Sequence, residues 1–349
     1  MSAPPVVRID QVTGLRTILA AARAERPIEF KAERPAATRD GDCPFCEGHE
    51  DETPPEFWAD RDSGGPDTPG WRTRSVPNLY PALAGEEGGG ASSTADAFSP
   101  TADPLRAAAR GAEPDLFTEV PATGVHEVIV HSPRHVTSLA ELDDAELASA
   151  VGAWRERMRA RAEEAACLQL IVNEGPAAGA SLEHSHAQLY ALGFVPALVA
   201  RERERFNAYH ERTQGGDLLA DVASEEVRRA ERLVAIDDDA LLICPWASRS
   251  PFELRIVPRR AAARFEDDGD AGVAMLGRAY AALGERFGGT PQLNLWVRTA
   301  PRGAEEFHWH IDIAPRLSIK AGFELATGVD INIYPPERAA AELKDCLPA

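Results

Sequence analysis

Residues 168–190 read LQLIVNEGPAAGASLEHSHAQLY, and this stretch decides how the chain is expected to fold. Its apolar beginning predicts a strand, its Gly-rich middle predicts a turn, and the alternating polarity of its end predicts a second strand. Residues two apart on a strand point to the same face, so His184, His186 and Gln188 should form one row. The stretch therefore predicts a row of histidine and glutamine side chains, suited to catalysis or metal binding, on one face of a sheet.

The same order of elements occurs twice along the chain. Each copy has a strand, a long amphipathic helix, a second strand and a third strand that carries His-x-His. The elements fall at 126–130, 141–165, 168–173 and 184–190 in the first copy, and at 252–258, 271–287, 293–298 and 308–313 in the second. Strands outnumber helices and follow one another directly, which favours antiparallel pairing. The repeat predicts an α+β fold of duplicated units, with antiparallel sheets and one long helix per unit.

Length, charge and apolar content indicate which classes of protein this chain can belong to. The 349 residues exceed one ordinary small domain, and 44% of them are hydrophobic, which is ample for buried cores. A net charge of −19 argues against a general nucleic-acid binder, whereas a few arginines could still make a local site for a small phosphorylated substrate. No apolar run reaches the length of a membrane span, and residues 1–5 lack a signal-peptide pattern, so we expect a cytoplasmic protein.

A cysteine pair suggests a metal site. The segment CPFC at 43–46 has the two-residue spacer that lets both thiolates reach one ion. The surrounding residues 34–77 are rich in Pro, Gly and charge, and no βαβ pattern flanks the pair, which favours a metal over a redox motif. A pair of ordinary reduced thiols is the alternative. Zinc would need two more ligands, for which His135 and His184 are the candidates.

His186 is the candidate nucleophile. A neutral imidazole can attack phosphorus near pH 7, because its unperturbed pKa lies close to that pH. If His184 binds the zinc, His186 stays free, and Gln188 could steady a phosphoryl oxygen without adding charge. The Gly-rich turn could add backbone N–H groups that face a phosphate. Taken alone, a His-x-His pair is more typical of surface histidines or of a partial metal site.

Several motifs in register resemble the galactose-1-phosphate uridylyltransferase family of the histidine triad superfamily. The row HSHAQ at 184–188 is similar to that family's His-x-His-x-Gln signature. The other similar segments are 43–46 with 53–56, 74–81, 132–135, and 322–324 with 327–328. The resemblance runs from about residue 8 to residue 338 and leaves mainly residues 84–115 unmatched, a stretch of Gly, Ala, Ser and Pro that we expect to be a flexible insertion. Ser185 is similar to the plant ADP-glucose phosphorylase relatives, since the transferases usually have proline there.

The resemblance implies roles for the matching residues. The implied ligands of one structural zinc are Cys43, Cys46, His135 and His184. His186 would form the nucleotidyl-histidine intermediate, and Gln188 would contact the transferred phosphoryl group. The implied nucleotide-binding residues are Asn78, Asn173 and Ser181, together with Arg23 and Arg26, whose guanidinium groups suit phosphate. For the two arginines, a solvated pair of charges at a helix end is the alternative.

A second metal site, frequent in the family, is matched only in part. Glu202, His308 and His310 fall at its positions, whereas Arg298 stands where some relatives have histidine. The cysteine pair of the plant relatives is missing, because residues 214–217 read QGGD. We therefore predict that no second metal binds, and that the two histidines are structural or face the nucleotide site.

The sequence thus predicts a nucleotidyltransferase. Residues 1–200 would form the unit with the zinc and His186, and residues 201–349 a catalytically degenerate unit. The expected reaction is a double displacement between a nucleoside diphosphate sugar and a sugar 1-phosphate, of the type found in galactose metabolism. Two alternatives stay open: a phosphorylase that uses inorganic phosphate as acceptor, and a non-catalytic, zinc-stabilised nucleotide-binding protein. By resemblance we also expect a homodimer, with no nucleic-acid or membrane partner.

Overall fold

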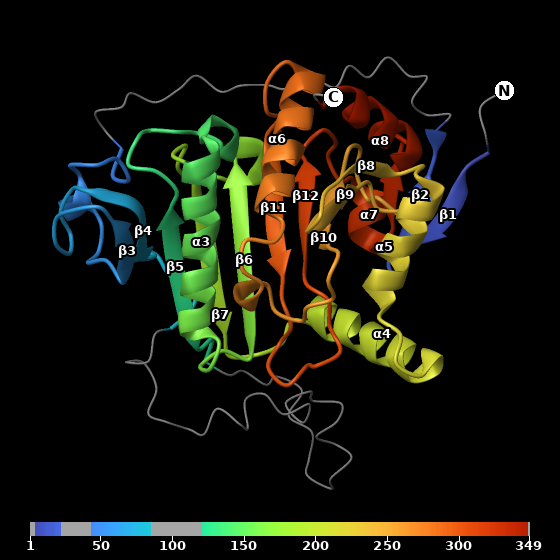
Figure 1. Cartoon of the computed structure of the whole chain (residues 1–349), viewed down its shortest axis with the longest axis horizontal. Coiled ribbons are helices and arrows are strands. Elements are labelled where there is room, and N and C mark those ends of the chain that lie inside the picture. Colours follow the sequence, from blue (N-terminus) through green and yellow to red (C-terminus); the bar gives the residue numbers. More distant parts are fainter. Residues whose placement is uncertain (1–3, 22–42, 85–120, 348–349) are drawn as a thin grey trace, which may run out of the picture.

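The computed structural model describes residues 4–21, 43–84 and 121–347, which form two sheets and their covering helices (Figure 1). The strands of the large sheet are β3 (Trp58–Arg61), β4 (Trp71–Pro77), β5 (Gly124–Val130), β6 (Cys167–Glu174), β7 (His186–Leu192), β8 (Leu233–Ile236), β9 (Ala240–Ile243), β10 (Leu254–Pro258), β11 (Leu293–Arg298) and β12 (His310–Pro315). The small sheet contains β1 (Val6–Ile9), β2 (Arg16–Leu19) and β13 (Asp330–Asn332). The helices are α3 (Asp144–Arg161), α4 (Ala197–Thr213), α5 (Leu218–Arg229), α6 (Val273–Phe287), α7 (Gly322–Thr327) and α8 (Pro336–Asp345).

The large sheet joins two copies of one arrangement. Its ten strands lie in the order β3-β4-β5-β7-β6-β11-β12-β10-β9-β8, and all paired neighbours are antiparallel. The order β5-β7-β6 on one side mirrors β10-β12-β11 on the other, and β6 pairs with β11 at the centre. The predicted α+β fold of duplicated, antiparallel units is confirmed. One pair in the small sheet, β2 with β13, is parallel.

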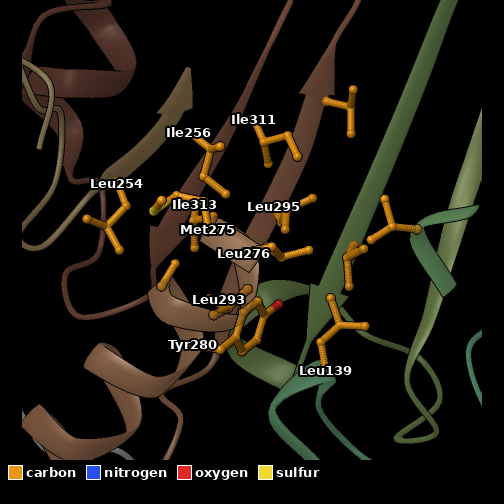
Figure 2. Close-up of a cluster of buried hydrophobic side chains, with 14 of the residues drawn as sticks. Leu139, Leu254, Ile256, Met275, Leu276, Tyr280, Leu293, Leu295, Ile311 and Ile313 are labelled. Carbon is orange, nitrogen blue, oxygen red and sulfur yellow. The ribbon is translucent and has the colours of Figure 1, made fainter. Parts of the chain in front are cut away.

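One long helix from each copy covers the same face of the sheet, as Figure 1 shows for α3 and α6. Asp143 begins α3 with a capping box that also involves Glu146, which satisfies N–H groups that the first turn leaves free. Trp154 and Met158, which lie on the predicted apolar face of α3, are fully buried. The close-up in Figure 2 shows the corresponding core under α6, with Leu276 and Tyr280 among leucines and isoleucines of β10, β11 and β12.

The opposite face of the sheet carries the polar side chains. On β7, Ala187, Leu189 and Ala191 belong to the core under the helices, so His186, Gln188 and Tyr190 point the other way. We call this the polar face. Over the first copy it packs against the segment that contains the cysteine pair, and over the second copy against α4 and α5.

Strand boundaries differ from the expected ones in one place that matters. The predicted strand at 184–190 begins only at His186 and runs to Leu192, so His184 lies in the bend before it. The backbone is held there by Ser185, whose N–H donates to the carbonyl of Val136 at 2.6 Å. The two histidines are therefore neighbours because of this bend and not because of strand alternation.

No helix in residues 4–21, 43–84 and 121–347 is long and apolar enough to cross a membrane. Most of the predicted flexible insertion at 84–115, and both candidate phosphate arginines, Arg23 and Arg26, lie outside the residues that the structure describes.

Candidate active site

His186 lies at the start of β7, on the polar face, and is 5% exposed. Its Nδ1 is 2.7 Å from the carbonyl oxygen of His184, so Nδ1–H donates and Nε2 keeps its lone pair. Burial lowers the pKa of His186, which the bond to the His184 carbonyl opposes. The neutral tautomer with a free Nε2 is the form that can act as a nucleophile.

The predicted zinc ligands are brought together. One ligand atom from each of Cys43, Cys46, His135 and His184 lies within 4.8 Å of the other three. His184 Nδ1 is 3.5 Å from Cys43 Sγ and 3.7 Å from Cys46 Sγ, and His135 Nδ1 is 3.4 Å from Cys46 Sγ. Tetrahedral zinc with two thiolates and two imidazoles separates sulfur from nitrogen by about 3.6 Å. The donor set and its spacing therefore fit a closed, four-coordinate metal site.

A backbone group orients one ligand of this cluster, and an aromatic side chain links the cluster to His186. The Nε2–H of His184 donates to the carbonyl of Ser132 at 2.9 Å, which turns Nδ1 toward the thiols. Phe45, between the two cysteines, packs edge-on against both His184 and His186, with ring centroids 6.1 Å and 5.3 Å away. A metal bound to these cysteines would thus hold Phe45, against which the ring of His186 packs.

The amide oxygen of Gln188 is held by two neighbours. The hydroxyl of Tyr190 donates to Oε1 at 2.9 Å, and Nε2 of His126 lies 3.0 Å from the same oxygen. His126 also lies 3.2 Å from the side-chain nitrogen of Asn78, a predicted nucleotide-binding residue. The structure therefore brings Gln188 and Asn78 together through His126, which the sequence showed only as the first residue of a strand.

The other predicted nucleotide-binding residues lie on or near the same face. Asn173 on β6 accepts a hydrogen bond from the amide of Asn294 on β11 at 2.7 Å, and the pairing of Val172 with Ala187 places Asn173 next to His186. Ser181 is exposed in the bend before His184. Within the described residues its hydroxyl has no hydrogen-bond partner, so it is free to meet a ligand.

The Gly-rich turn does not offer its N–H groups as expected. The amides of residues 178–180 donate to carbonyls of the turn itself, and that of Ala177 donates to the side chain of Gln292 at 2.6 Å. Gly175 and Gly179 have φ angles of 85° and 87°, which fold the turn back on itself. The prediction that these groups face a phosphate is therefore wrong for residues 177–180.

Ser185 is tied into the protein interior behind the nucleophile. Trp154 Nε1–H donates to His131 Nε2 at 3.0 Å, so the other ring nitrogen carries the proton and donates to Ser185 Oγ at 2.9 Å. His131 and Ser185 are 1% and 3% exposed. This chain of hydrogen bonds reaches the residue between the two histidines, and its partners could not be read from local sequence.

A cavity of about 250 Å³ continues the polar face beyond Asn294. Among the side chains that line it are Arg249, Arg316 and Lys320, which are cationic, and Glu324, which belongs to one of the motifs noted above. Two more carboxylates line it, because Glu253 pairs with Arg249 and Asp330 pairs with Lys320, both at 2.7 Å. A pocket with three cations and three carboxylates suits a polar ligand rich in hydroxyl groups.

At the candidate second metal position, His308 and Arg298 make contacts within the protein. The nitrogens of His308 face Asp217 Oδ1 and the Pro258 carbonyl, both at 3.0 Å, so neither is free for an ion. Arg298 lies 3.3 Å from Glu202 and brings a guanidinium where an ion would need a ligand. His310 Nδ1 faces the carbonyl of His308 at 3.2 Å, which repeats the arrangement of His186.

Comparisons with known proteins agree with this geometry. The family model described as "Galactose-1-phosphate uridyl transferase, N-terminal domain" matches residues 78–196. The chain is 29% identical to the ADP-glucose phosphorylase of Arabidopsis thaliana over 98% of this chain and 93% of that protein. It is 23% identical to the galactose-1-phosphate uridylyltransferase of Neurospora crassa over 97% of this chain and 94% of that protein.

The fold is shared as well. The crystal structure of the Arabidopsis thaliana ADP-glucose phosphorylase with bound ADP-glucose superposes with a TM-score of 0.76 at 27% identity, over 98% of this chain and 99% of that one. Motif order, family model and fold therefore show that this chain is a nucleotidyltransferase similar to the galactose-1-phosphate uridylyltransferases and to the ADP-glucose phosphorylase of Arabidopsis thaliana.

Proposed function

We propose that this protein transfers a nucleotidyl group from a nucleoside diphosphate sugar through a covalent intermediate on His186. The main observation behind the proposal is that the Nδ1–H of His186 donates to the carbonyl of His184. This bond leaves the Nε2 lone pair free on the polar face. Nε2 forms a bond to the α-phosphorus, and the bond from that phosphorus to the bridging oxygen breaks. The sugar 1-phosphate leaves with the electron pair of that oxygen.

The second step regenerates the enzyme. A phosphate oxygen of the acceptor attacks the same phosphorus, and the bond to Nε2 breaks, so the electron pair returns to the ring. Because the donor's product leaves before the acceptor reacts, the kinetics should be ping-pong. The protein contributes positioning and stabilisation of charge on the phosphoryl oxygens, for which the amide of Gln188 is suited.

Asn78, Asn173 and Ser181 would bind the nucleotide. Arg23 and Arg26 remain a proposal from family resemblance alone. One zinc ion on Cys43, Cys46, His135 and His184 would be structural, because four protein ligands leave no open position. It would hold the bend at His184 and, through Phe45, the ring of His186.

The acceptor we propose is a sugar 1-phosphate, as for the galactose-1-phosphate uridylyltransferases that the chain resembles. The polar cavity beyond Asn294, which is lined by both cationic and acidic side chains, supports a sugar at this end of the polar face. A homodimer, a cytoplasmic location, a role in galactose metabolism and the division into units at 1–200 and 201–349 are further proposals.

A second candidate differs only in the acceptor. In an ADP-glucose phosphorylase-like enzyme, inorganic phosphate would take the nucleotidyl group and release a nucleoside diphosphate. Two observations favour it: Ser185 stands between the histidines, and the ADP-glucose phosphorylase of Arabidopsis thaliana is similar along almost the whole chain.

Acceptor tests on isolated nucleotidyl-enzyme separate these activities. The protein is incubated with UDP-glucose or ADP-glucose, freed of small molecules and then mixed with galactose 1-phosphate or inorganic phosphate. Release of the label as UDP-galactose or ADP-galactose, according to the nucleotide sugar used, by galactose 1-phosphate supports the transferase. Release as a nucleoside diphosphate by inorganic phosphate supports the phosphorylase. A protein that binds nucleotide sugars but never becomes labelled would instead be a non-catalytic binding protein.

A further inference from the structure

The side-chain amide of Gln188 can lie in two orientations, and only one of them serves the proposed reaction. With Oε1 toward β5 and the protein, the NH₂ group is left to donate to a phosphoryl oxygen. With the amide flipped, an acceptor oxygen would face the negatively charged phosphate and repel it. Catalysis through Gln188 therefore requires that the protein select the first orientation.

The surroundings of His126 determine which of its ring nitrogens carries a proton. The backbone N–H of Ala82 donates to Nδ1 at 3.3 Å, so Nδ1 is an acceptor and Nε2 carries the hydrogen. That hydrogen points to Gln188 Oε1 at 3.0 Å. The Asn78 side-chain nitrogen also lies 3.2 Å from Nε2, but an amide NH₂ group cannot accept this hydrogen. The Asn78 oxygen, which could accept it, instead accepts the N–H of Tyr80 at 2.8 Å.

His126 is a rigid donor. It lies on β5 directly opposite Tyr190 on β7, and the two rings stack with centroids 4.0 Å apart and planes 23° apart. It is 7% exposed, so the ring has little room to turn. The Tyr190 hydroxyl donates to the same Gln188 oxygen at 2.9 Å.

Two donors on one carbonyl oxygen use both of its lone pairs. If the Gln188 amide flipped, its NH₂ group would face the N–H of His126 and that hydrogen bond would be lost, although the Tyr190 hydroxyl could turn and accept instead. His126 therefore selects the orientation, and Tyr190 adds a second hydrogen bond that holds it. Among the described residues the Gln188 NH₂ group has no protein partner in the observed orientation, so its two hydrogens stay available to a ligand.

We propose that His126 and Tyr190 are positioning residues that hold the Gln188 amide with its NH₂ group toward the transferred phosphoryl group. The inference rests on the proposed function, since it assigns the reason why Gln188 can act there. Neither residue touches the reacting atoms; both act through Gln188.

A double-mutant cycle tests this dependence. The variants are His126→Phe, Tyr190→Phe and Gln188→Ala, alone and combined, and the readout is the single-turnover rate at which a nucleotide sugar labels His186. Removal of a donor that faces developing charge costs about 100- to 1,000-fold in other enzymes, and loss of orientation should cost less, roughly 10- to 100-fold. His126→Phe should therefore slow labelling by roughly that factor and change the Kd of the nucleotide sugar by less than about threefold.

The decisive comparison is made in the Gln188→Ala background. If His126 acts through Gln188, His126→Phe should cause no further loss once the amide is gone. An equal loss in both backgrounds would overturn the proposal, because His126 would then act independently of Gln188. His126→Gln, which keeps an N–H donor, should recover part of the rate that His126→Phe loses.

One control variant and the labelling of the parent chain keep the result interpretable. Tyr190→Phe retains the stacked ring and removes only the hydroxyl donor, so it tests the same idea even if His126→Phe is too unstable to purify. It should slow labelling in the parent and have no effect in Gln188→Ala. Failure of the proposed function looks different, because the parent chain would then show no label on His186 at all.

Discussion

Glu174 offers a test of the packing between the two copies. It follows Asn173 on β6 and is 5% exposed, with its carboxylate bonded to the backbone N–H of Leu139, the hydroxyl of Ser138 and the hydroxyl of Tyr280 at 2.8, 2.8 and 3.2 Å. Burial raises the pKa of Glu174 from 4.5 to about 7, although the three hydrogen bonds favour the charged form. The carboxyl thus keeps its proton in the folded chain at pH values where the unfolded chain has lost it.

The sign of the effect on stability follows from this difference. Because the folded state binds the proton more tightly, the contribution of Glu174 is fully present below pH 4.5 and is lost as the pH rises toward 7. At about 1.4 kcal/mol per pH unit, the contribution amounts to about 3 kcal/mol in the free energy of unfolding. Glu174→Gln cannot ionise, so it should remove this dependence while other groups keep theirs.

Denaturant unfolding of the parent and of Glu174→Gln at pH values between 5 and 8 measures the effect. The free energy of unfolding of the parent minus that of the variant should fall by about 2 to 3 kcal/mol across this range. Glu211→Gln, which replaces an exposed carboxylate on α4, is the matched control and should show no such trend. The same parent–variant difference at every pH would refute the reasoning about Glu174.

Two further predictions concern the metal and a buried ion pair. The purified chain should hold about one zinc per molecule, and the double variant Cys43→Ser, Cys46→Ser should lose it, whereas Cys346→Ser should retain it by metal analysis. A ratio near two in the parent would show that the second position does bind. Glu127→Gln should lower the free energy of unfolding by about 3 to 5 kcal/mol in denaturant titrations, because the carboxylate is fully buried against two arginines. The exposed Arg134, changed to Gln, should cost less than about 1 kcal/mol; equal losses would contradict the argument from burial.

Much of the fold was predictable because it follows from patterns within single segments. Alternation on β7 separates Ala187 and Leu189 from Gln188 and Tyr190, and the apolar spacing on α3 places Trp154 in the core. The repeated order of elements along the chain predicted the duplication, and the strand order of the large sheet confirms it. The cluster of two cysteines and two histidines was also predicted, from spacing and family resemblance together.

What could not be predicted depends on register between distant strands. The contact of His126 with Gln188 exists because β5 and β7 pair with Val128 opposite Gln188, and nothing near either residue in the sequence specifies that pairing. The same holds for the contacts of His308 and Arg298 at the second metal position, where the partners come from α4 and from the connection between α4 and α5. For the Gly-rich turn, composition suggested N–H groups free for phosphate, but the turn's own carbonyls accept most of them.

Variants of His186 and His184 separate the loss of the nucleophile from the loss of the metal site. His186→Ala should abolish nucleotidyl transfer and leave the metal content nearly unchanged, because His184 and not His186 belongs to the metal cluster. His184→Ala should show the reverse balance, with lost metal and lowered stability. Rescue of His186→Gly by free imidazole would place the missing chemistry on the ring itself.

The covalent intermediate is the most direct measurement of the central claim. The parent chain is incubated with a nucleotide sugar, denatured at neutral or alkaline pH to preserve the phosphorus–nitrogen bond, and examined by intact-mass and peptide mass spectrometry. The account predicts a mass increase equal to one nucleoside monophosphate less water, located on the peptide that contains His186 and absent from His186→Ala. A label on any other residue, or a His186→Ala variant that still becomes labelled, would contradict it.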